Sequence, residues 1–165
     1  MAIFKVINQA GNYRNEDAEE RLNGYAASRK KTRQDSVFGG AVLPEIAALS
    51  MKAITEVYRN DAGLRLRHSI LSFDPHEGIS PAMAKQIAQQ ACDYYAGSYQ
   101  IVAAIHEDKE HLHIHFVMNA TNYNDGTKYR GDKKDYYGFL KHLNQIVKPY
   151  GINIRAVQNQ ESDKL

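Results

Sequence analysis

Long hydrophobic runs, cysteine pairs and a strong net charge are all missing from this chain of 165 residues. No apolar run approaches the roughly 18–20 residues that a membrane-spanning helix needs. The start MAIFKVINQAG also lacks the basic residues and the long apolar stretch of a signal peptide. A single cysteine, Cys92, excludes an internal disulfide framework and is typical of a reducing compartment. We therefore expect a cytoplasmic protein that does not insert into a membrane.

The net charge of +2 does not by itself indicate a nucleic-acid-binding protein. Basic residues are nevertheless clustered at 28–33, 65–67 and 128–134, where the default interpretation is a solvated surface. Repeats, low-complexity segments and proline-rich linkers are also lacking. With 43% hydrophobic and 24% charged residues, the chain can build a core. We expect one domain over residues 1–158, followed by a flexible tail at 159–165.

Hydrophobic periodicity predicts an alternation of strands and helices. The expected strands are 2–8, 64–73, 98–106, 111–120 and 151–157, and the expected helices are 16–31, 44–61, 80–97 and 134–150. The two central strands are joined by only four residues, EDKE, which predicts a hairpin. An antiparallel or mixed sheet with helices mainly on one face follows, which is an α+β domain.

Four histidines lie within ten positions in the stretch AIHEDKEHLHIHFVMNAT, residues 104–121. His111, His113 and His115 alternate with hydrophobic residues, and alternate residues of a strand share one face. Because the hydrophobic set must pack against the helices, the histidines are predicted to lie on the face that the helices leave open. A regular hairpin would place His106 beside His111 and diagonal to His113.

Three imidazoles this close can bind one divalent ion, each through a ring nitrogen at about 2.0–2.2 Å. An exposed polar strand face that merely tolerates histidine is the alternative, and the clustering favours the metal site. The sets 106/111/113 and 106/113/115 both satisfy the spacing. Imidazole alone does not discriminate strongly between zinc, manganese, nickel and iron. Asp108 is either a carboxylate that fixes an imidazole tautomer or a solvated turn residue.

Three segments carry a resemblance to a known family. HEDKEHLHIHFVMNATNYNDGTKYRGDKKDYY (106–137) holds the histidine strand, RHSILSFDPHEGISPAMAKQIAQQ (67–90) is a strand–turn–helix unit, and LNGYAASRKKT (22–32) places a tyrosine before a basic string. In this order they resemble the motifs of plasmid relaxases, the mobilisation nucleases related to VirD2-type proteins. The likeness extends over nearly all of residues 1–156, and the histidine motif is specific.

The resemblance implies a five-stranded antiparallel sheet in the ferredoxin-like architecture of endonucleases with a His-hydrophobic-His strand motif (HUH endonucleases). It implies a divalent ion on three histidines, with Mn²⁺ or Mg²⁺ expected and Zn²⁺ or Ni²⁺ able to substitute in vitro. The ligands map to His106, His113 and His115, and the nucleophile maps to Tyr25. His111 remains a neighbour of this set, and Asn119 either supports the metal site or simply ends the strand.

The implied reaction cuts one DNA strand at the nic site of a plasmid or integrative-element transfer origin. Attack by the tyrosine leaves a 5′-phosphotyrosyl bond and a free 3′-hydroxyl, and this hydroxyl can later reseal the strand. The nick initiates conjugative transfer. The chain departs from the family at Arg29, where relatives commonly have proline in an xxPEKT-like string. It is also short, since many relaxases continue into a primase, helicase or other domain.

Tyr25 would be assigned to the core by its pattern alone, because it lies on the apolar stripe of the expected helix and the chain has 11 tyrosines. The family motif reverses that assignment in favour of catalysis. Tyr13 is the other candidate near the N-terminus, in a setting that is typical of a loop.

Single-stranded or hairpin DNA of the transfer origin is the expected partner, together with a relaxosome accessory protein and a coupling protein. Arginine and lysine position a nucleic-acid backbone without reading its sequence, and tyrosines interleaved with them can stack on bases. His68 and Ser72 are expected to share the open sheet face and contact DNA, although a half-buried strand histidine is equally compatible with His68. The remaining expected DNA contacts are Arg29, Lys30, Lys31, Arg33, Tyr129, Arg130, Lys133 and Lys134.

Three other functions fit parts of the pattern. A metal-dependent phosphodiester hydrolase would use the histidines to activate water and would not need Tyr25. An HUH-type replication initiator usually places its tyrosine after the histidines rather than before them. A non-enzymatic module that binds DNA hairpins would use the ion only as a structural element.

Overall fold

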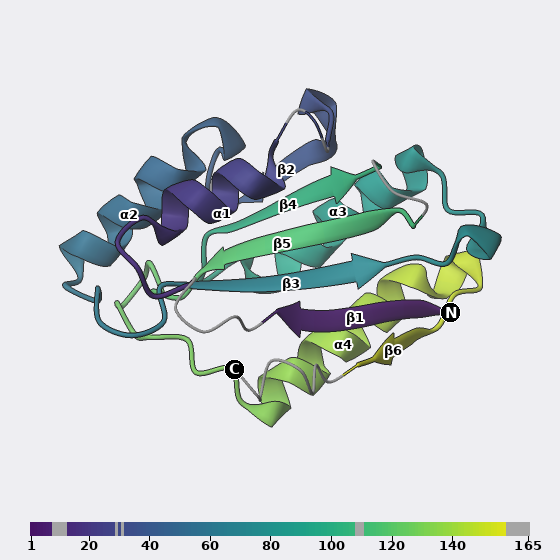
Figure 1. The fold of residues 1–165 in the computed structure, drawn as a ribbon. Coiled ribbons are helices and arrows are strands. Elements are labelled where there is room, and N and C mark those ends of the chain that lie inside the picture. Colours follow the sequence, from purple (N-terminus) through teal and green to yellow (C-terminus); the bar gives the residue numbers. More distant parts are fainter. Residues whose placement is uncertain (8–12, 29, 31, 108–110, 158–165) are drawn as a thin grey trace.

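A mixed sheet of six strands, in the order β2-β4-β5-β3-β1-β6, forms the centre of the computed structural model (Figure 1). The structure describes residues 1–7, 13–28, 30, 32–107 and 111–157. Residues 159–165, which were expected to form a flexible tail, lie outside this described part. The strands are β1 (Ala2–Ile7), β2 (Val37–Gly40), β3 (Leu66–Ser72), β4 (Ile101–His106), β5 (His113–Asn119) and β6 (Ile154–Ala156).

The α+β class predicted from the sequence is confirmed, with one strand more than expected. All neighbouring strands pair antiparallel except β1 and β6, which are parallel. The additional strand is β2, which pairs with β4 at the edge of the sheet. Its sequence, VFGG, is short and half glycine, a composition that is depleted in strands and gives little periodic signal.

Helices lie on both faces of the sheet (Figure 1). The helices are α1 (Ala18–Ala26), α2 (Ala47–Val57), α3 (Pro81–Ala96) and α4 (Lys133–Val147). The larger core lies under α3 and α4, where Phe4, Phe116 and Phe139 pack together. A smaller core lies on the other face, where Leu22 and Met51 meet Val102 and Val117 of the central strands.

The helix ends follow local sequence signals. The side chain of Ser80 accepts a hydrogen bond from Met83 N before Pro81 begins α3, and Asp132 accepts one from Asp135 N before α4. α1 ends at Ala26, earlier than the expected helix over 16–31. No helix in the described ranges is long and apolar enough to cross a membrane.

A buried ion pair fixes α1 to the sheet. Arg65, just before β3, donates from Nε to Oε1 of Glu19 at 2.8 Å, and the two side chains are 4% and 0% exposed. The backbone N–H of Arg65 also donates to the carbonyl of Tyr13, ahead of α1. These bonds hold the N-terminal helix over β4 and β5, where the histidines lie.

Candidate metal centre and adjoining tyrosine

The register of the two central strands brings three histidines together. His106 on β4 pairs directly with His113 on β5, and Ala104 pairs with His115. The expected pairing of His106 with His111 was wrong, because β5 begins at His113 and the connection between the strands is two residues longer than EDKE. His111 precedes the strand and therefore does not share its face.

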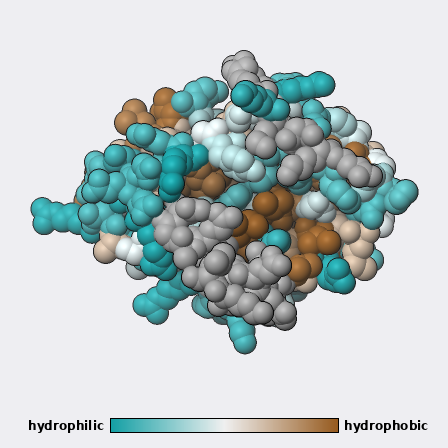
Figure 2. Space-filling model, in the orientation of Figure 1, coloured by the Kyte–Doolittle hydropathy of each residue, from teal (hydrophilic) through white to brown (hydrophobic). Residues whose placement is uncertain are grey.

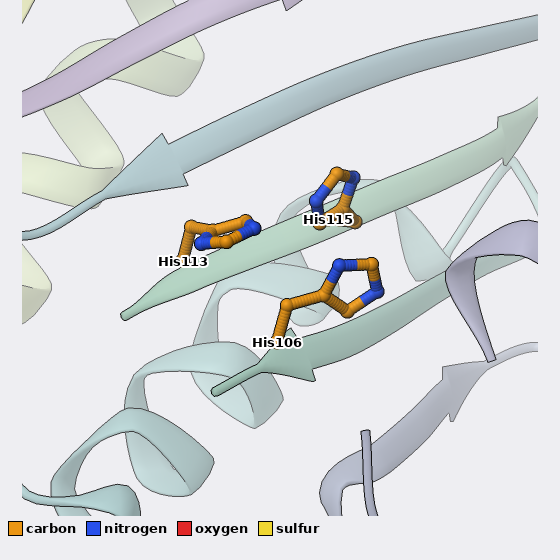
Figure 3. Close-up of side chains that lie close together, drawn as sticks. All are labelled: His106, His113 and His115. Atoms are coloured by element: carbon orange, nitrogen blue, oxygen red, sulfur yellow. The ribbon is translucent and has the colours of Figure 1, made fainter. Parts of the chain in front are cut away.

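His106, His113 and His115 each offer one ring nitrogen, and these atoms lie within 4.8 Å of one another (Figure 3). The ring centroids are 3.9 Å apart for His106 and His115, and 5.0 Å apart for His113 and His115. Of the two sets that the spacing left open, the structure therefore assembles 106/113/115. The side chain of His111 lies elsewhere, with Nδ1 donating to Phe73 O at 3.2 Å.

Hydrogen bonds to backbone carbonyls set the tautomer of two of these imidazoles. A carbonyl oxygen only accepts, so Nε2 of His106 carries the proton that is donated to Ala26 O at 2.7 Å. In the same way, Nδ1 of His113 donates to His111 O at 2.7 Å. The nitrogens that carry a lone pair are then Nδ1 of His106 and Nε2 of His113. Metal-binding histidines are held in this way by partners on their other nitrogen.

The third imidazole has a side-chain partner. Nδ1 of His115 lies 2.9 Å from Nε2 of His68 on β3, and the two rings stack with centroids 5.1 Å apart. When Nδ1 of His115 is the donor in this contact, Nε2 of His115 completes a set of three neutral nitrogen donors. Three imidazoles, without cysteine, suit a divalent ion that keeps positions open for other ligands, so the residues present fit the expected ion.

The histidine face is less open than the sequence suggested. His106 and His115 are 0% and 2% exposed, while His113 is only half-buried. The reason is α1, whose C-terminal end lies over β4 and β5 and accepts the bond from His106 through Ala26. The sequence pattern predicted the polar face correctly but contains no signal for this second helical layer.

Tyr25 lies beside the histidines at the end of α1. Its ring makes edge contacts with His106 and His115, at centroid distances of 5.8 and 5.7 Å. The side chain is 44% exposed, although the helical pattern placed it on the apolar stripe. It lines a pocket of about 580 Å³ together with Tyr13, His68 and His115.

Tyr13 is the less suitable of the two tyrosines for chemistry. It is 6% exposed, and its hydroxyl lies 3.1 Å from Nδ1 of His68. Burial, followed by the proximity of Tyr25, raises the pKa of Tyr13 to about 12. It is thus a buried partner of His68 rather than the loop tyrosine that its sequence setting indicated.

Asn119, which was expected to support the metal site or to end the strand, is the last residue of β5. It is fully buried at the opposite end of β5 from His113. Its Nδ2 donates to Met51 O and to Oε1 of Gln100, and its Oδ1 accepts from Thr121 N. These bonds join β5 to α2 and account for the buried side chain of Asn119. Asp108 lies outside the described residues.

His68 and Ser72 lie on β3 next to the histidine strand. Ser72 pairs with His113 and is partly exposed, as expected for a residue of the open face. His68, in contrast, is 5% exposed. Burial, followed by the proximity of the His106 imidazole, lowers the pKa of His68 to about 4, so the imidazole of His68 is neutral near pH 7.

The basic residues expected to contact DNA fall into two groups. Lys30 and Arg33 follow α1 and are exposed, and Arg33 pairs with Glu107 at 3.5 Å. Arg29 and Lys31 lie outside the described residues. The second group follows β5 in the chain and consists of Arg130, Lys133 and Lys134. The C-terminal end of β5 lies about 20 Å from His113 at the usual rise per residue of a strand.

Tyr129 is not a surface platform for a base. It is 6% exposed, its ring lies under the guanidinium of Arg67, and its hydroxyl donates to Asp135. These contacts within the protein explain the buried position of Tyr129 without a contact to DNA.

Arg21 is a residue of the pocket that the sequence reasoning missed. It lies one helical turn before Tyr25, lines the same pocket and pairs with Asp17 at 3.3 Å on the surface. The four-residue spacing from Tyr25 on a predicted helix was the available signal.

The family model for the nuclease domain of MobA/VirD2-like relaxases matches residues 18–152 of this sequence. The chain belongs to this relaxase family. The matched range contains Tyr25, His68 and the three clustered histidines. The resemblance identified from the motifs is thereby confirmed.

Curated relatives of this relaxase domain are longer proteins. Protein rlx of Staphylococcus aureus is 26% identical over 110 residues, which are 67% of this chain and 35% of that protein. The group II intron-interrupted relaxase LtrB of Lactococcus lactis subsp. cremoris is 32% identical over 113 residues, 68% of this chain and 19% of that protein. The match thus spans about a third of the length of rlx and about a fifth of the length of LtrB.

A solved structure described as "Molecular Basis of Vancomycin Resistance Transfer in Staphylococcus aureus" has a similar fold. The TM-score is 0.60, and the match covers 97% of this chain and 99% of the other. With 12% sequence identity, this likeness shows the fold of the relaxase domain alone.

Proposed function

We propose that this chain is the nuclease domain of a relaxase that nicks one strand of DNA at a transfer origin by tyrosine transesterification. The observation that carries the proposal is the position of Tyr25, partly exposed and in edge contact with two of three clustered histidines. Membership of the relaxase family supports the same activity. The strand, the origin sequence and the resealing step are parts of the proposal.

The hydroxyl of Tyr25 is the nucleophile. The new bond from its oxygen to phosphorus replaces the bond from phosphorus to the 3′ oxygen, and the phenolic proton is finally carried by the 3′-hydroxyl. No water is consumed, so the phosphotyrosyl bond retains the energy of the original linkage and the 3′ end can reverse the reaction. α1 positions Tyr25 rigidly, because Glu19 and Ala26 of the same helix are bonded to Arg65 and His106.

His106, His113 and His115 would hold the divalent ion, which we propose to be Mn²⁺ or Mg²⁺. When bound, such an ion stabilises negative charge that develops on the scissile phosphate and helps to orient it. The three imidazoles are neutral donors that do not cancel the charge of the ion.

Single-stranded DNA would lie across the uncovered part of the histidine face. Figure 2 shows hydrophobic residues in the middle of this face with hydrophilic residues around them. Ile7 and Ile70 line the pocket of Tyr25 and can contact unstacked bases, while Arg21 on the rim can contact a phosphate. Accessory and coupling proteins of a relaxosome remain predicted partners.

The decisive experiment is a search for a covalent adduct. The protein is incubated with Mn²⁺ or Mg²⁺ and single-stranded oligonucleotides that span candidate transfer origins of its host element. We expect a denaturant-resistant protein–DNA adduct, with the modified residue mapped to Tyr25 by mass spectrometry. Tyr25→Phe should abolish the adduct and lower nicking by at least about 10³-fold, while Mn²⁺ still binds.

Tyr137→Phe is the matched control, because Tyr137 is 57% exposed on α4. It should leave nicking unchanged. Nicking by Tyr25→Phe at the wild-type rate would favour a metal-dependent hydrolase instead. An adduct on Tyr13 would identify Tyr13 as the nucleophile in place of Tyr25. The absence of any adduct with several candidate origins would favour a DNA-binding module.

A further inference from the structure

Three buried polar side chains form a hydrogen-bonded chain behind the candidate metal centre. The hydroxyl of Tyr13 lies 3.1 Å from Nδ1 of His68, and Nε2 of His68 lies 2.9 Å from Nδ1 of His115. The side chains are 6%, 5% and 2% exposed. Their residues come from three separate segments, namely the turn before α1, β3 and β5.

The chain of bonds has two possible proton arrangements in the protein alone. Two imidazole nitrogens in hydrogen-bonding contact share one hydrogen, and either ring can donate it. If His115 binds an ion through Nε2, its own proton must be on Nδ1 and is donated to Nε2 of His68. The proton of His68 is then on Nδ1, where it is donated to the oxygen of Tyr13. Metal binding is therefore compatible with one arrangement only.

His115 differs in this respect from the two other ligands. His106 and His113 donate to backbone carbonyls, which can only accept and so fix the tautomer by themselves. His68 can accept or donate, so it fixes His115 only when Tyr13 takes the proton on its other nitrogen. The tautomer of His115 thus depends on side chains, which substitution can remove.

We propose that His68 and Tyr13 are positioning residues, which hold His115 in the tautomer and ring orientation that a divalent ion requires. This inference rests on the proposed metal-dependent function. Burying three polar groups is costly unless they are fully bonded, and apolar side chains could fill the same space. Partners of this kind typically change metal affinity about 10–100-fold.

The test measures Mn²⁺ affinity by calorimetry, without DNA. His68→Leu should weaken Mn²⁺ binding about 10–100-fold, and His68→Gln, whose carbonyl oxygen can accept from Nδ1 of His115, should restore much of it. Tyr13→Phe removes a single oxygen and should weaken binding about 2–10-fold, the value of one hydrogen bond. Circular dichroism and urea unfolding establish that each variant is folded.

Two substitutions serve as matched controls. His142 donates to Gln90 O and Tyr123 donates to Ala96 O, so each makes a hydrogen bond to a backbone carbonyl away from the histidine cluster. His142→Leu and Tyr123→Phe should leave Mn²⁺ affinity unchanged. Equal losses in Tyr13→Phe and Tyr123→Phe would mean that the effect on affinity is general destabilisation, which would overturn the proposal.

A spectroscopic measurement reads the proton arrangement directly. In protein labelled with ¹⁵N-histidine and loaded with diamagnetic Zn²⁺, His68 and His115 should both be protonated on Nδ1. Protonation of His68 on Nε2 in the loaded protein would overturn the proposal, as would wild-type affinity in folded His68→Leu. If wild-type protein binds no divalent ion at all, the proposed function fails together with this inference, whereas normal adduct formation with unchanged affinity in His68→Leu refutes only the positioning role.

Discussion

His106 donates from Nε2 to the carbonyl oxygen of Ala26 across 2.7 Å, which joins a candidate metal ligand on β4 to the residue that follows Tyr25 in α1. The same bond fixes the tautomer of the His106 imidazole and the end of the helix that carries Tyr25, the proposed nucleophile. The distance from the imidazoles to the phenol ring is therefore set by the packing of α1 on the sheet.

This bond predicts unequal effects of two ligand substitutions on the metal-free protein. His106→Ala removes a fully buried ring and its bond to Ala26, so the free energy of unfolding should fall by about 2–4 kcal/mol. His113→Ala removes a half-buried ring and should cost less than about 1 kcal/mol. Urea unfolding in the presence of a chelator measures both. Equal costs would show that His106 does not anchor α1.

The choice between the two histidine sets predicts a difference in metal affinity. His115→Ala removes a donor of the cluster and should weaken Mn²⁺ binding by more than about 100-fold. His111→Ala leaves the carbonyl that accepts from His113 in place and should change affinity by less than about threefold. Isothermal titration calorimetry distinguishes the two results. A large loss in His111→Ala would instead favour the set 106/111/113.

The hydrogen bonds of Asn119 give a third prediction. Asn119→Ala leaves Thr121 N and Oε1 of Gln100 without their buried partner, which should lower the free energy of unfolding by about 2–4 kcal/mol. Mn²⁺ affinity should be unchanged, because the residue lies at the far end of β5. Thermal unfolding and calorimetry test the two statements separately. Weaker Mn²⁺ binding by folded Asn119→Ala would show that Asn119 supports the metal site.

The sequence contained the residues of the site but not their three-dimensional partners. Period-two alternation placed His113 and His115 on one face, and the family motif added His106 and Tyr25. Register was mispredicted because it depends on where β5 begins, and no local signal distinguishes four loop residues from six. The partner of His115 is His68, 47 positions away on another strand, and such a contact follows only from the pairing of β3 with β5.

The fold was predictable to a similar degree. Helices with strong caps, α3 and α4, agree with their expected ranges within one residue at the N-terminus, since Ser80 and Asp132 mark where they begin. Strand β2 was missed because Gly39 and Gly40 give no pattern. Gly39 is required there by a close approach, since a Cβ would lie 1.9 Å from the carbonyl oxygen of Val42. That contact is invisible until the chain is folded.

Burial of the single cysteine gives a prediction on pH. Burial, with the charge of Asp93 as a smaller cause, raises the pKa of the Cys92 thiol to about 12. At pH 8 the thiolate fraction should be about 10³-fold smaller than in the unfolded chain, so a thiol reagent should label native protein at least that much more slowly. Rapid stoichiometric labelling of native protein would contradict the buried position.

The same shift links stability to pH with a defined sign. Between about pH 9 and 12, the unfolded chain loses the proton of Cys92 while the folded protein keeps it. The free energy of unfolding should therefore decrease as the pH rises through this window. Cys92→Ala removes this contribution, so its stability should depend less steeply on pH than that of wild-type protein. Identical slopes would show that the folded thiol titrates normally.

The pair Arg65–Glu19 predicts how strongly α1 is attached to the sheet. Both side chains are buried, so Glu19→Ala leaves an uncompensated guanidinium and should lower the free energy of unfolding by about 3–5 kcal/mol. Asp17→Ala removes the exposed partner of Arg21 on the same helix and should cost less than about 1 kcal/mol. Urea unfolding compares the two variants. If Glu19→Ala costs no more than Asp17→Ala, the pair does not fix α1. Nicking by folded Glu19→Ala should also fall, because Tyr25 is carried by the same helix.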